Sequence, residues 1–261
     1  MNEKIVLGID IGGTGMKGAI VDTETGELLT ERIKILTPQP ATPKAVTRVF
    51  RQLIEEIGWE GELIGCGFPA IIKQNVAKSA ANIHLEWINK NVVKLFQNAV
   101  NREVFILNDA DAAGLAEVRK GAGKDKKGTI IMVTVGTGLG SAVFTNGYLV
   151  PNTELGHFKM HGKVAEHYAS NSARKKFDLN WEEWGGRLNE YLYHLQRLFS
   201  PDMFILGGGV SKKMEFFRKH LTVEIPIKKA VFQNNAGIIG AAMYAVEQAS
   251  VWNGIKADTR F

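Results

Sequence analysis

The sequence has little cysteine, no long apolar run and no secretory leader. Its 261 residues include a single cysteine, Cys66, which excludes a disulfide within the chain and most zinc sites. No apolar run approaches the length of a membrane span, and the opening MNEKIVLGID lacks the pattern of a signal peptide. We therefore expect a cytoplasmic protein with no membrane partner. The net charge of +5 suits a polyanionic partner, but many proteins that bind none carry a similar excess.

Two common phosphate-binding loops are also missing. No GxxxxGK[ST] loop occurs, because GAGKDKKGT at 121–129 has the wrong spacing. A dinucleotide site needs a helix after its glycines, whereas the glycines of IDIGGTGMKGAIVD at 9–22 are followed by a run that reads as a strand. These glycines are therefore predicted to lie at a strand-turn-strand corner.

This corner occurs twice in the chain. The run TIIMVTVGTGLGSAVFTNGYLV at 129–150 repeats the pattern of KIVLGIDIGGTGMKGAIVDTETGELL at 4–29, with an apolar strand, a Gly/Thr turn and a small-residue strand. Backbone N–H groups at such turns, together with threonine hydroxyls, can converge on an anion. The repeat predicts two lobes that each present one phosphate loop to a shared cleft. A pair of tight turns without a ligand is the alternative.

The rest of the chain predicts an α/β protein. Apolar spacing indicates a helix in 42–58, with Thr42 as its cap, Pro43 in its first turn and Gly58 at its end. A strand runs into a helix at 103–118, and a helix rich in Gly and Ala follows at 236–249. Another helix, at 181–199, is predicted to bury one face, formed by Trp181, Trp184, Leu188, Leu192, Leu195 and Leu198.

Five segments occur in the order typical of one family. They are DIGGTGMK (10–17), NDADAAGLAE (108–117), VGTGLGSA (135–142), ELGH (154–157) with Glu166, and LGGGVSK (206–212). On these segments the chain resembles the ROK family of sugar kinases and sugar-responsive repressors. It is most similar to the branch of polyphosphate glucokinases, through segments that include TPQPATP (37–43), VPNTELGH (150–157) and AEHYAS (165–170).

The resemblance implies an α/β, two-lobed actin-like or ribonuclease-H-like fold with a cleft between the lobes. Residues 1–107 would form a small N-terminal lobe and residues 108–245 a large C-terminal lobe. A C-terminal helix at about 246–261 would pack back on the small lobe. A homodimer is expected from the family.

The implied activity is transfer of the terminal phosphoryl group of inorganic polyphosphate or ATP to the 6-hydroxyl of glucose. Asp109 would be the general base. It follows a predicted strand, at the end where α/β proteins bind ligands. The alternative is that Asp109 only caps the next helix, but Asp111 can take that role.

The resemblance also assigns the binding residues. The sugar would contact Pro69, Asn82, Asn108, Asp109, Glu154, His157 and Glu166. The phosphoryl donor would contact Gly12, Gly13, Thr14, Lys17, Thr137, Gly138, Gly208 and Gly209. Asp10 would hold Mg²⁺ through water, because Mg²⁺ keeps much of its hydration shell.

The chain departs from the family in two ways that limit its partners. Many members carry a zinc-binding cysteine cluster after the ELGH-like segment, but FKMHGKVAEHYASN at 158–171 has no cysteine, so no structural zinc is expected. ROK repressors carry a winged-helix domain before the first strand, and none precedes it in this sequence, so no DNA binding is expected.

Several alternatives stay open at this point. The enzyme could be a strictly ATP-dependent hexokinase or glucomannokinase that also accepts mannose, or the chain could be a sugar sensor without turnover. The basic run RKGAGKDKKG at 119–128 is interpreted as a solvated loop. A track for a polyphosphate tail is the other interpretation of that run.

Overall fold

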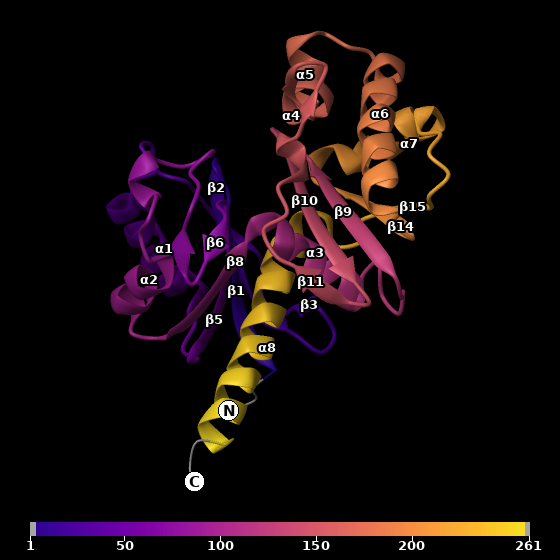
Figure 1. Ribbon diagram of the computed structural model, residues 1–261. Coiled ribbons are helices and arrows are strands. Elements are labelled where there is room, and N and C mark those ends of the chain that lie inside the picture. The colour runs from indigo at the N-terminus through magenta and orange to yellow at the C-terminus, as the bar shows by residue number, and fades with distance from the viewer. Residues whose placement is uncertain (1–3, 259–261) are drawn as a thin grey trace. The chain divides into compact units, whose positions relative to one another are not determined.

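The structure is a computed structural model that describes residues 4–258, with side chains up to residue 251 (Figure 1). Its contacts divide the chain into two compact units. Unit 1 combines the chain up to Ala116 with the chain from Asn235 onward, and unit 2 is Glu117–Asn234. Among residues 4–258, no helix is both long and apolar enough to cross a membrane.

Unit 1 is built on a mixed sheet with strand order β3-β2-β1-β5-β8, and β4 pairs with β2. β1 and β2 form an antiparallel hairpin, while β5 and β8 run parallel to β1. The strands are β1 (Ile5–Ile11), β2 (Gly15–Asp22), β3 (Glu27–Leu28), β4 (Ile33–Leu36), β5 (Leu63–Phe68) and β8 (Glu103–Asn108). The first glycine corner is thus the turn between β1 and β2, as predicted.

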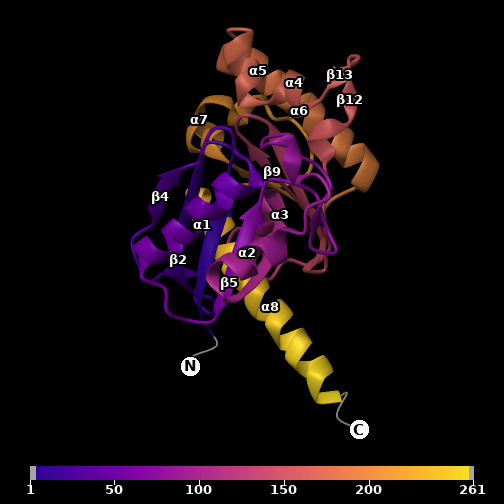
Figure 2. The same ribbon diagram turned by 90° about the vertical axis from the view of Figure 1, so that its left-hand side faces the viewer.

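Two helices, α1 (Pro43–Ile57) and α2 (Val92–Val100), cover one face of this sheet, and α8 (Ala236–Asp258) covers the other (Figures 1 and 2). The predicted boundaries of the first helix are confirmed, because Thr42 caps α1, Pro43 begins it and Gly58 ends it in a left-handed conformation. α1 and α2 meet through Phe50 and Phe96, whose rings stack with centroids 4.1 Å apart.

The helix α8 lies unusually close to the sheet because small residues line the contact. A Cβ added at Gly65 of β5 would collide with the backbone oxygen of Ala241, and one at Gly8 of β1 with that of Ile238. Only glycine permits this approach, since any side chain would push the helix away from the strands. Within α8, Gly240 meets the same requirement, because a Cβ added there would collide with the backbone oxygen of Ala112.

The observed units divide the chain at 116/117 and 234/235, whereas the sequence placed the lobe boundary at 107/108 and the returning helix at about 246–261. The difference arises because α8 already begins at residue 236 and packs on the sheet of unit 1. The first part of α3 (Asp109–Lys120) joins the same unit, and Ala112 packs with Leu107 and Ala241 in one buried cluster.

Unit 2 repeats the plan of unit 1 with a mixed sheet of order β11-β10-β9-β14-β15. β9 and β10 form the second antiparallel hairpin, and β14 runs parallel to β9. The strands are β9 (Thr129–Val135), β10 (Leu139–Thr145), β11 (Tyr148–Val150), β14 (Met203–Gly207) and β15 (Ile227–Lys229). The predicted repeat of the strand-turn-strand corner is confirmed.

The long helix of unit 2, α6 (Trp181–Phe199), begins with a capping box formed by Asn180 and Glu183. Most of the predicted apolar face is buried, but Leu198 is 68% exposed. That part of the prediction is wrong because the helix ends one residue later, beyond the sheet-facing residues. The shorter elements are β6 (Ile72–Lys73), β7 (Val76–Ala77), β12 (Lys159–Met160), β13 (Lys163–Val164), α4 (Glu166–Ala169), α5 (Asn171–Lys176) and α7 (Met214–Phe217).

A fully buried carboxylate, Glu117, ties together three parts of unit 2. Its Oε2 accepts backbone N–H bonds from Ala122 at 2.9 Å and Val231 at 3.0 Å, and its Oε1 accepts one from Phe232 at 2.8 Å. Glu117 is the first residue of unit 2, and residues 231–232 lie just before the chain leaves it. One side chain therefore holds both points at which the chain crosses between the units.

Candidate functional site

In unit 1, three predicted site segments meet at one edge of the sheet, where the parallel strands β1, β5 and β8 end. Asp10 pairs with Gly67, and Asp109 follows the last residue of β8. A Cβ added at Gly67 would lie 3.5 Å from the Asp109 Cα and 3.8 Å from the Asp10 Oδ1. Gly67 therefore lies directly beside both carboxylate residues.

Asp10 forms an ion pair with Lys17. The two residues are direct partners across the β1–β2 hairpin, and the Lys17 Nζ lies 3.0 Å from the Asp10 Oδ2. Their side chains keep exposed fractions of 16% for Asp10 and 26% for Lys17, so both can still reach a ligand. A Cβ at Gly237 would lie 2.9 Å from the Asp10 Cγ, which places the positive first turn of α8 beside the carboxylate.

The turn from Gly12 to Gly15 is closed by a backbone bond of 3.0 Å from the Gly12 N–H to the Gly15 oxygen. The segment after β4 braces it: the Thr37 hydroxyl donates to the Gly12 oxygen at 2.6 Å, and the Gln39 amide donates to the Gly13 oxygen at 3.3 Å. These side chains engage carbonyl oxygens of the turn and do not occupy the N–H groups of Gly13 and Thr14. Thr14 and Lys17 retain exposed surface.

The brace formed by Thr37 and Gln39 was not assigned from the sequence, although the TPQPATP run that contains it was noted. No local signal reveals it, because Thr37 lies 25 residues from Gly12. Asn82 is exposed and also lies over this turn, since a Cβ at Gly13 would be 3.1 Å from its backbone oxygen.

Asn108 caps the helix α3. Its Oδ1 accepts the backbone N–H groups of Ala110 at 2.8 Å and Asp111 at 3.1 Å, and its Nδ2 donates to the Ala70 oxygen at 3.3 Å. The expectation that Asp111 supplies the cap is wrong, because Asn108 precedes the first helical residue and is in position to do so. The cap also binds the Pro69–Ala70 turn to the start of α3.

Asp109 occupies the first position of α3 and is partly exposed, whereas its neighbour Asn108 is only 7% exposed. Its Oδ1 accepts the Ala110 N–H at 2.9 Å. Because Asn108 supplies the principal cap, Asp109 is not required for that role. Pro69 is buried in the adjoining turn.

In unit 2, the second glycine turn is closed by a 3.0 Å bond from the Gly136 N–H to the Gly138 oxygen. Thr137 is exposed at its tip. Gly208, which follows β14, has a φ of +75°, and a Cβ there would lie 2.5 Å from the Val135 oxygen. Glycine is required by both the conformation and the contact, and Gly209 continues the same loop.

The predicted sugar residues Glu154, His157 and Glu166 come together in unit 2. The His157 Nδ1 lies 3.7 Å from the Glu154 Oε2, and its Nε2 lies 3.8 Å from the Glu166 Oε1. Burial raises the pKa of the Glu154 carboxyl; nearby His157 lowers it in part and Glu166 raises it. The imidazole between two carboxylates offers donors and acceptors to a polyhydroxylated ligand.

The Glu154–His157 segment is fixed by residues that the sequence interpretation missed. Ser141 of β10 is 3% exposed; its hydroxyl donates to the Thr153 oxygen and accepts the Leu155 N–H at 2.9 Å. A Cβ at Gly156 would collide with the Leu139 oxygen. A buried serine on a strand gives no sequence signal of this role, because its partners lie twelve to fourteen residues away.

The Glu166 carboxylate also touches the second glycine turn, where a Cβ at Gly138 would overlap its Oε2. A predicted donor residue and a predicted sugar residue are therefore in contact within unit 2. Across the described residues, no group of three His, Cys, Asp or Glu side chains is arranged to hold a metal ion.

The α/β fold, with two mixed sheets that each contain a glycine-turned hairpin, matches solved structures of ROK sugar kinases. The ROK family glucokinase from Streptomyces griseus, solved with glucose and AMPPNP, matches with a TM-score of 0.80 at 24% identity, covering 93% of this chain and 99% of that chain. The ROK hexokinase from Thermus thermophilus matches with a TM-score of 0.73 at 24% identity, covering 95% and 99%.

The sequence comparisons are more specific. The model of the ROK family matches residues 6–173. The polyphosphate glucokinase of Mycobacterium tuberculosis is 45% identical over 241 residues, which cover 92% of this chain and 91% of that protein. The inorganic polyphosphate/ATP-glucomannokinase from Arthrobacter sp. strain KM matches with a TM-score of 0.90 at 45% identity, covering 94% of this chain and 99% of that chain. The chain belongs to the ROK family.

Proposed function

We propose that the protein transfers the terminal phosphoryl group of inorganic polyphosphate to the 6-hydroxyl of glucose, giving glucose 6-phosphate. The observation that carries this proposal is the 45% identity to a polyphosphate glucokinase over 92% of the chain. The geometry within each unit supports it, since unit 1 offers a carboxylate beside a glycine turn and unit 2 offers a His–Glu cluster beside another.

Asp109 is the general base of the proposed reaction. Its carboxylate would accept the proton of the glucose 6-hydroxyl as the hydroxyl oxygen bonds to phosphorus and the bond to the donor's bridging oxygen breaks. Such transfer needs mainly positioning and charge neutralisation. The cap made by Asn108 supports this role by fixing the start of α3. The Asn108 Oδ1 already accepts two backbone N–H groups, and its Nδ2 donates to the Ala70 oxygen. Asn108 would therefore offer the sugar mainly its second Nδ2 hydrogen.

The sugar would be bound by Glu154, His157 and Glu166 in unit 2 and by Asn82 and the Pro69 turn in unit 1. Carboxylates accept from vicinal hydroxyls, and the imidazole can donate or accept. The ion-pair distances of 3.7 and 3.8 Å around His157 leave its ring nitrogens loosely held, so hydroxyl groups can compete for them.

The donor phosphates would bind the N–H groups and side chains of the two glycine turns, with the loop at Gly208 and Gly209 beyond them. The ion pair of Lys17 with Asp10 fits a magnesium site, because Mg²⁺ is usually bound by one or two carboxylates, waters and substrate phosphates. When bound, Mg²⁺ would neutralise phosphate charge. Asp10 would hold it through water, and Lys17 would turn to the phosphate.

The choice of donor and sugar needs a direct comparison. The Arthrobacter structure is named a polyphosphate/ATP-glucomannokinase, which favours ATP as a second donor and mannose as a second acceptor. Initial rates with each donor and each sugar, in the presence of Mg²⁺, decide this. Product from ATP but not from polyphosphate would replace the proposal with an ATP-dependent hexokinase, and glucose binding without product would favour a sensor. A homodimer and a cytoplasmic location stay predictions.

A further inference from the structure

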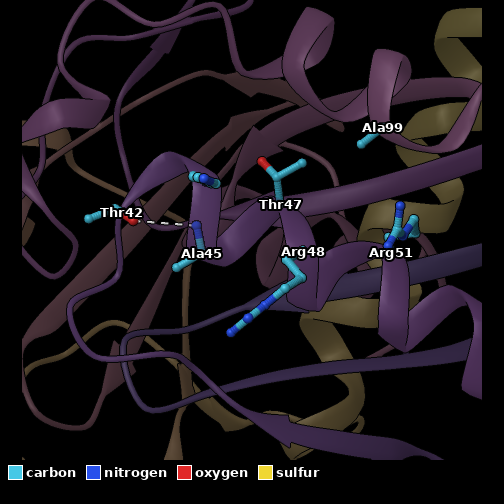
Figure 3. Close-up of a pocket in the computed structure, with 7 residues that line it drawn as sticks. Thr42, Ala45, Thr47, Arg48, Arg51 and Ala99 are labelled. Carbon is cyan, nitrogen blue, oxygen red and sulfur yellow. Dashed lines mark hydrogen bonds between the residues drawn. The ribbon is translucent and has the colours of Figure 1, made fainter.

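Unit 1 contains a cavity that has no role in the proposed site. It has a volume of about 460 Å³ and lies mainly along α1, lined by Thr42, Lys44, Ala45, Thr47, Arg48, Arg51 and Ala99 (Figure 3). Lys44, Arg48 and Arg51 recur at the spacing that aligns side chains on one helix face, and all three are exposed. We call these three residues the cation row. It spans about 10 Å along the helix.

The charges of α1 are arranged against the helix macrodipole. Helices favour acidic residues in the first turn and basic residues in the last. In α1 the first turn has no acidic residue and contains Lys44, while the last turn has no basic residue and contains Glu55 and Glu56. A cation in the first turn of a helix, such as Lys44, opposes its folding unless an anion offsets it, and such local conflicts are typical of functional sites.

Two members of the cation row are available to a ligand. Among the described residues, Lys44 and Arg48 have no ion-pair partner, while the Arg51 Nε lies 3.4 Å from the Glu55 Oε1. The Thr47 hydroxyl oxygen at this cavity is shielded from solvent and lacks a hydrogen-bond partner in the described part of the chain. The lining therefore offers an anion the exposed charges of Lys44 and Arg48, which are unpaired within the residues that the structure describes.

The chain links the cation row directly to the glycine turn of unit 1. Thr37 and Gln39 bond to the oxygens of Gly12 and Gly13. Lys44 is the fifth residue after Gln39, so their Cα atoms lie at most about 17 Å apart. An extended phosphate chain that leaves the turn along this segment would reach the row.

We propose that the cation row binds the distal phosphates of an extended inorganic polyphosphate donor. The inference rests on the proposed function, since the proximal phosphates must occupy the glycine turn. It differs from the interpretation of the basic run at 119–128 as the track for a polyphosphate tail. That run contains Asp125, only its residues 124–127 are exposed, and none of its residues lines this cavity.

The test compares a Lys44→Ala/Arg48→Ala variant with wild type and with a Lys175→Ala/Lys176→Ala control, which removes the same charge from α5. Equilibrium binding of long-chain polyphosphate is measured without glucose, and KM is measured for long-chain polyphosphate, tripolyphosphate and ATP. We expect the α1 variant to weaken long-chain binding and raise its KM roughly three- to tenfold. Tripolyphosphate and ATP should give unchanged values, and the α5 control should match wild type.

Three results would overturn the inference: unchanged long-chain binding, an equal loss with all three donors, or the same loss in the α5 control. Thermal unfolding separates misfolding from lost binding, because removing Lys44 from the first turn should not lower the Tm. If ATP supports turnover and no polyphosphate does, the proposed donor fails. In that case, if the variant binds long-chain polyphosphate as tightly as wild type does, the proposal that the cation row binds polyphosphate fails as well.

Discussion

The buried carboxylate of Glu117 permits a quantitative prediction of stability. In a Glu117→Gln variant, the amide oxygen can replace only one carboxylate oxygen. If it takes the Oε2 position, it keeps the bonds from Ala122 and Val231, but the NH₂ group then faces the Phe232 N–H. A buried N–H without a partner costs about 1–3 kcal/mol, and the two retained bonds lose their charge assistance. We expect a total destabilisation of about 2–4 kcal/mol.

Urea unfolding followed by circular dichroism measures this effect. With a slope of about 2 kcal/mol per molar urea, the midpoint should fall by about 1–2 M. Glu224→Gln, which neutralises an exposed glutamate of the same unit, should leave the midpoint unchanged. A Glu117→Gln midpoint within about 0.3 M of wild type would refute the reasoning, because it would mean that the three N–H bonds contribute little to the fold.

Three further predictions concern the candidate site residues of each unit. Thr37→Val removes the hydroxyl that braces Gly12 and should raise the donor KM severalfold without changing glucose binding, which steady-state kinetics and calorimetry measure; an unchanged donor KM would count against the brace. Gly138→Ala places a methyl group against the Glu166 carboxylate and should weaken glucose binding in calorimetry, so wild-type affinity would contradict the packing. Burial raises the pKa of Glu154, so the stability from its protonated form is present at acid pH and lost as the pH rises through the folded pKa. The Tm of Glu154→Gln minus the Tm of wild type should therefore increase from acid to neutral pH. A Tm difference that stays constant over this pH range would contradict this account.

The sequence predicted elements whose causes are local. The cap at Thr42, the first turn at Pro43 and the end at Gly58 each act within a few residues, so the helix could be located without a structure. Both glycine hairpins were found because their strand-turn-strand pattern is also local. Leu198 was misplaced because apolar spacing does not reveal where a helix extends beyond its sheet.

The features that the sequence did not predict depend on contacts between distant residues. Ser141 fixes the Glu154 segment, and Thr37 fixes the first glycine turn, through bonds that span 12 and 25 residues. The boundary of unit 1 depends on Gly8 and Gly65, which let α8 pack closely against the sheet. This contact could not be predicted without knowing how the strands pair. Asn108 was assigned to the sugar alone because its role as a cap depends on where α3 begins.

The central claim is that Asp109 removes the proton from glucose while polyphosphate supplies the phosphoryl group. The most direct test measures glucose 6-phosphate formed from ATP-free polyphosphate, glucose and Mg²⁺ by wild type and by Asp109→Asn. The account predicts that wild type forms the product and that the variant loses about 10²–10⁴-fold in kcat while it binds glucose with similar affinity. No product from wild type, or turnover by the variant at the wild-type rate, would contradict it.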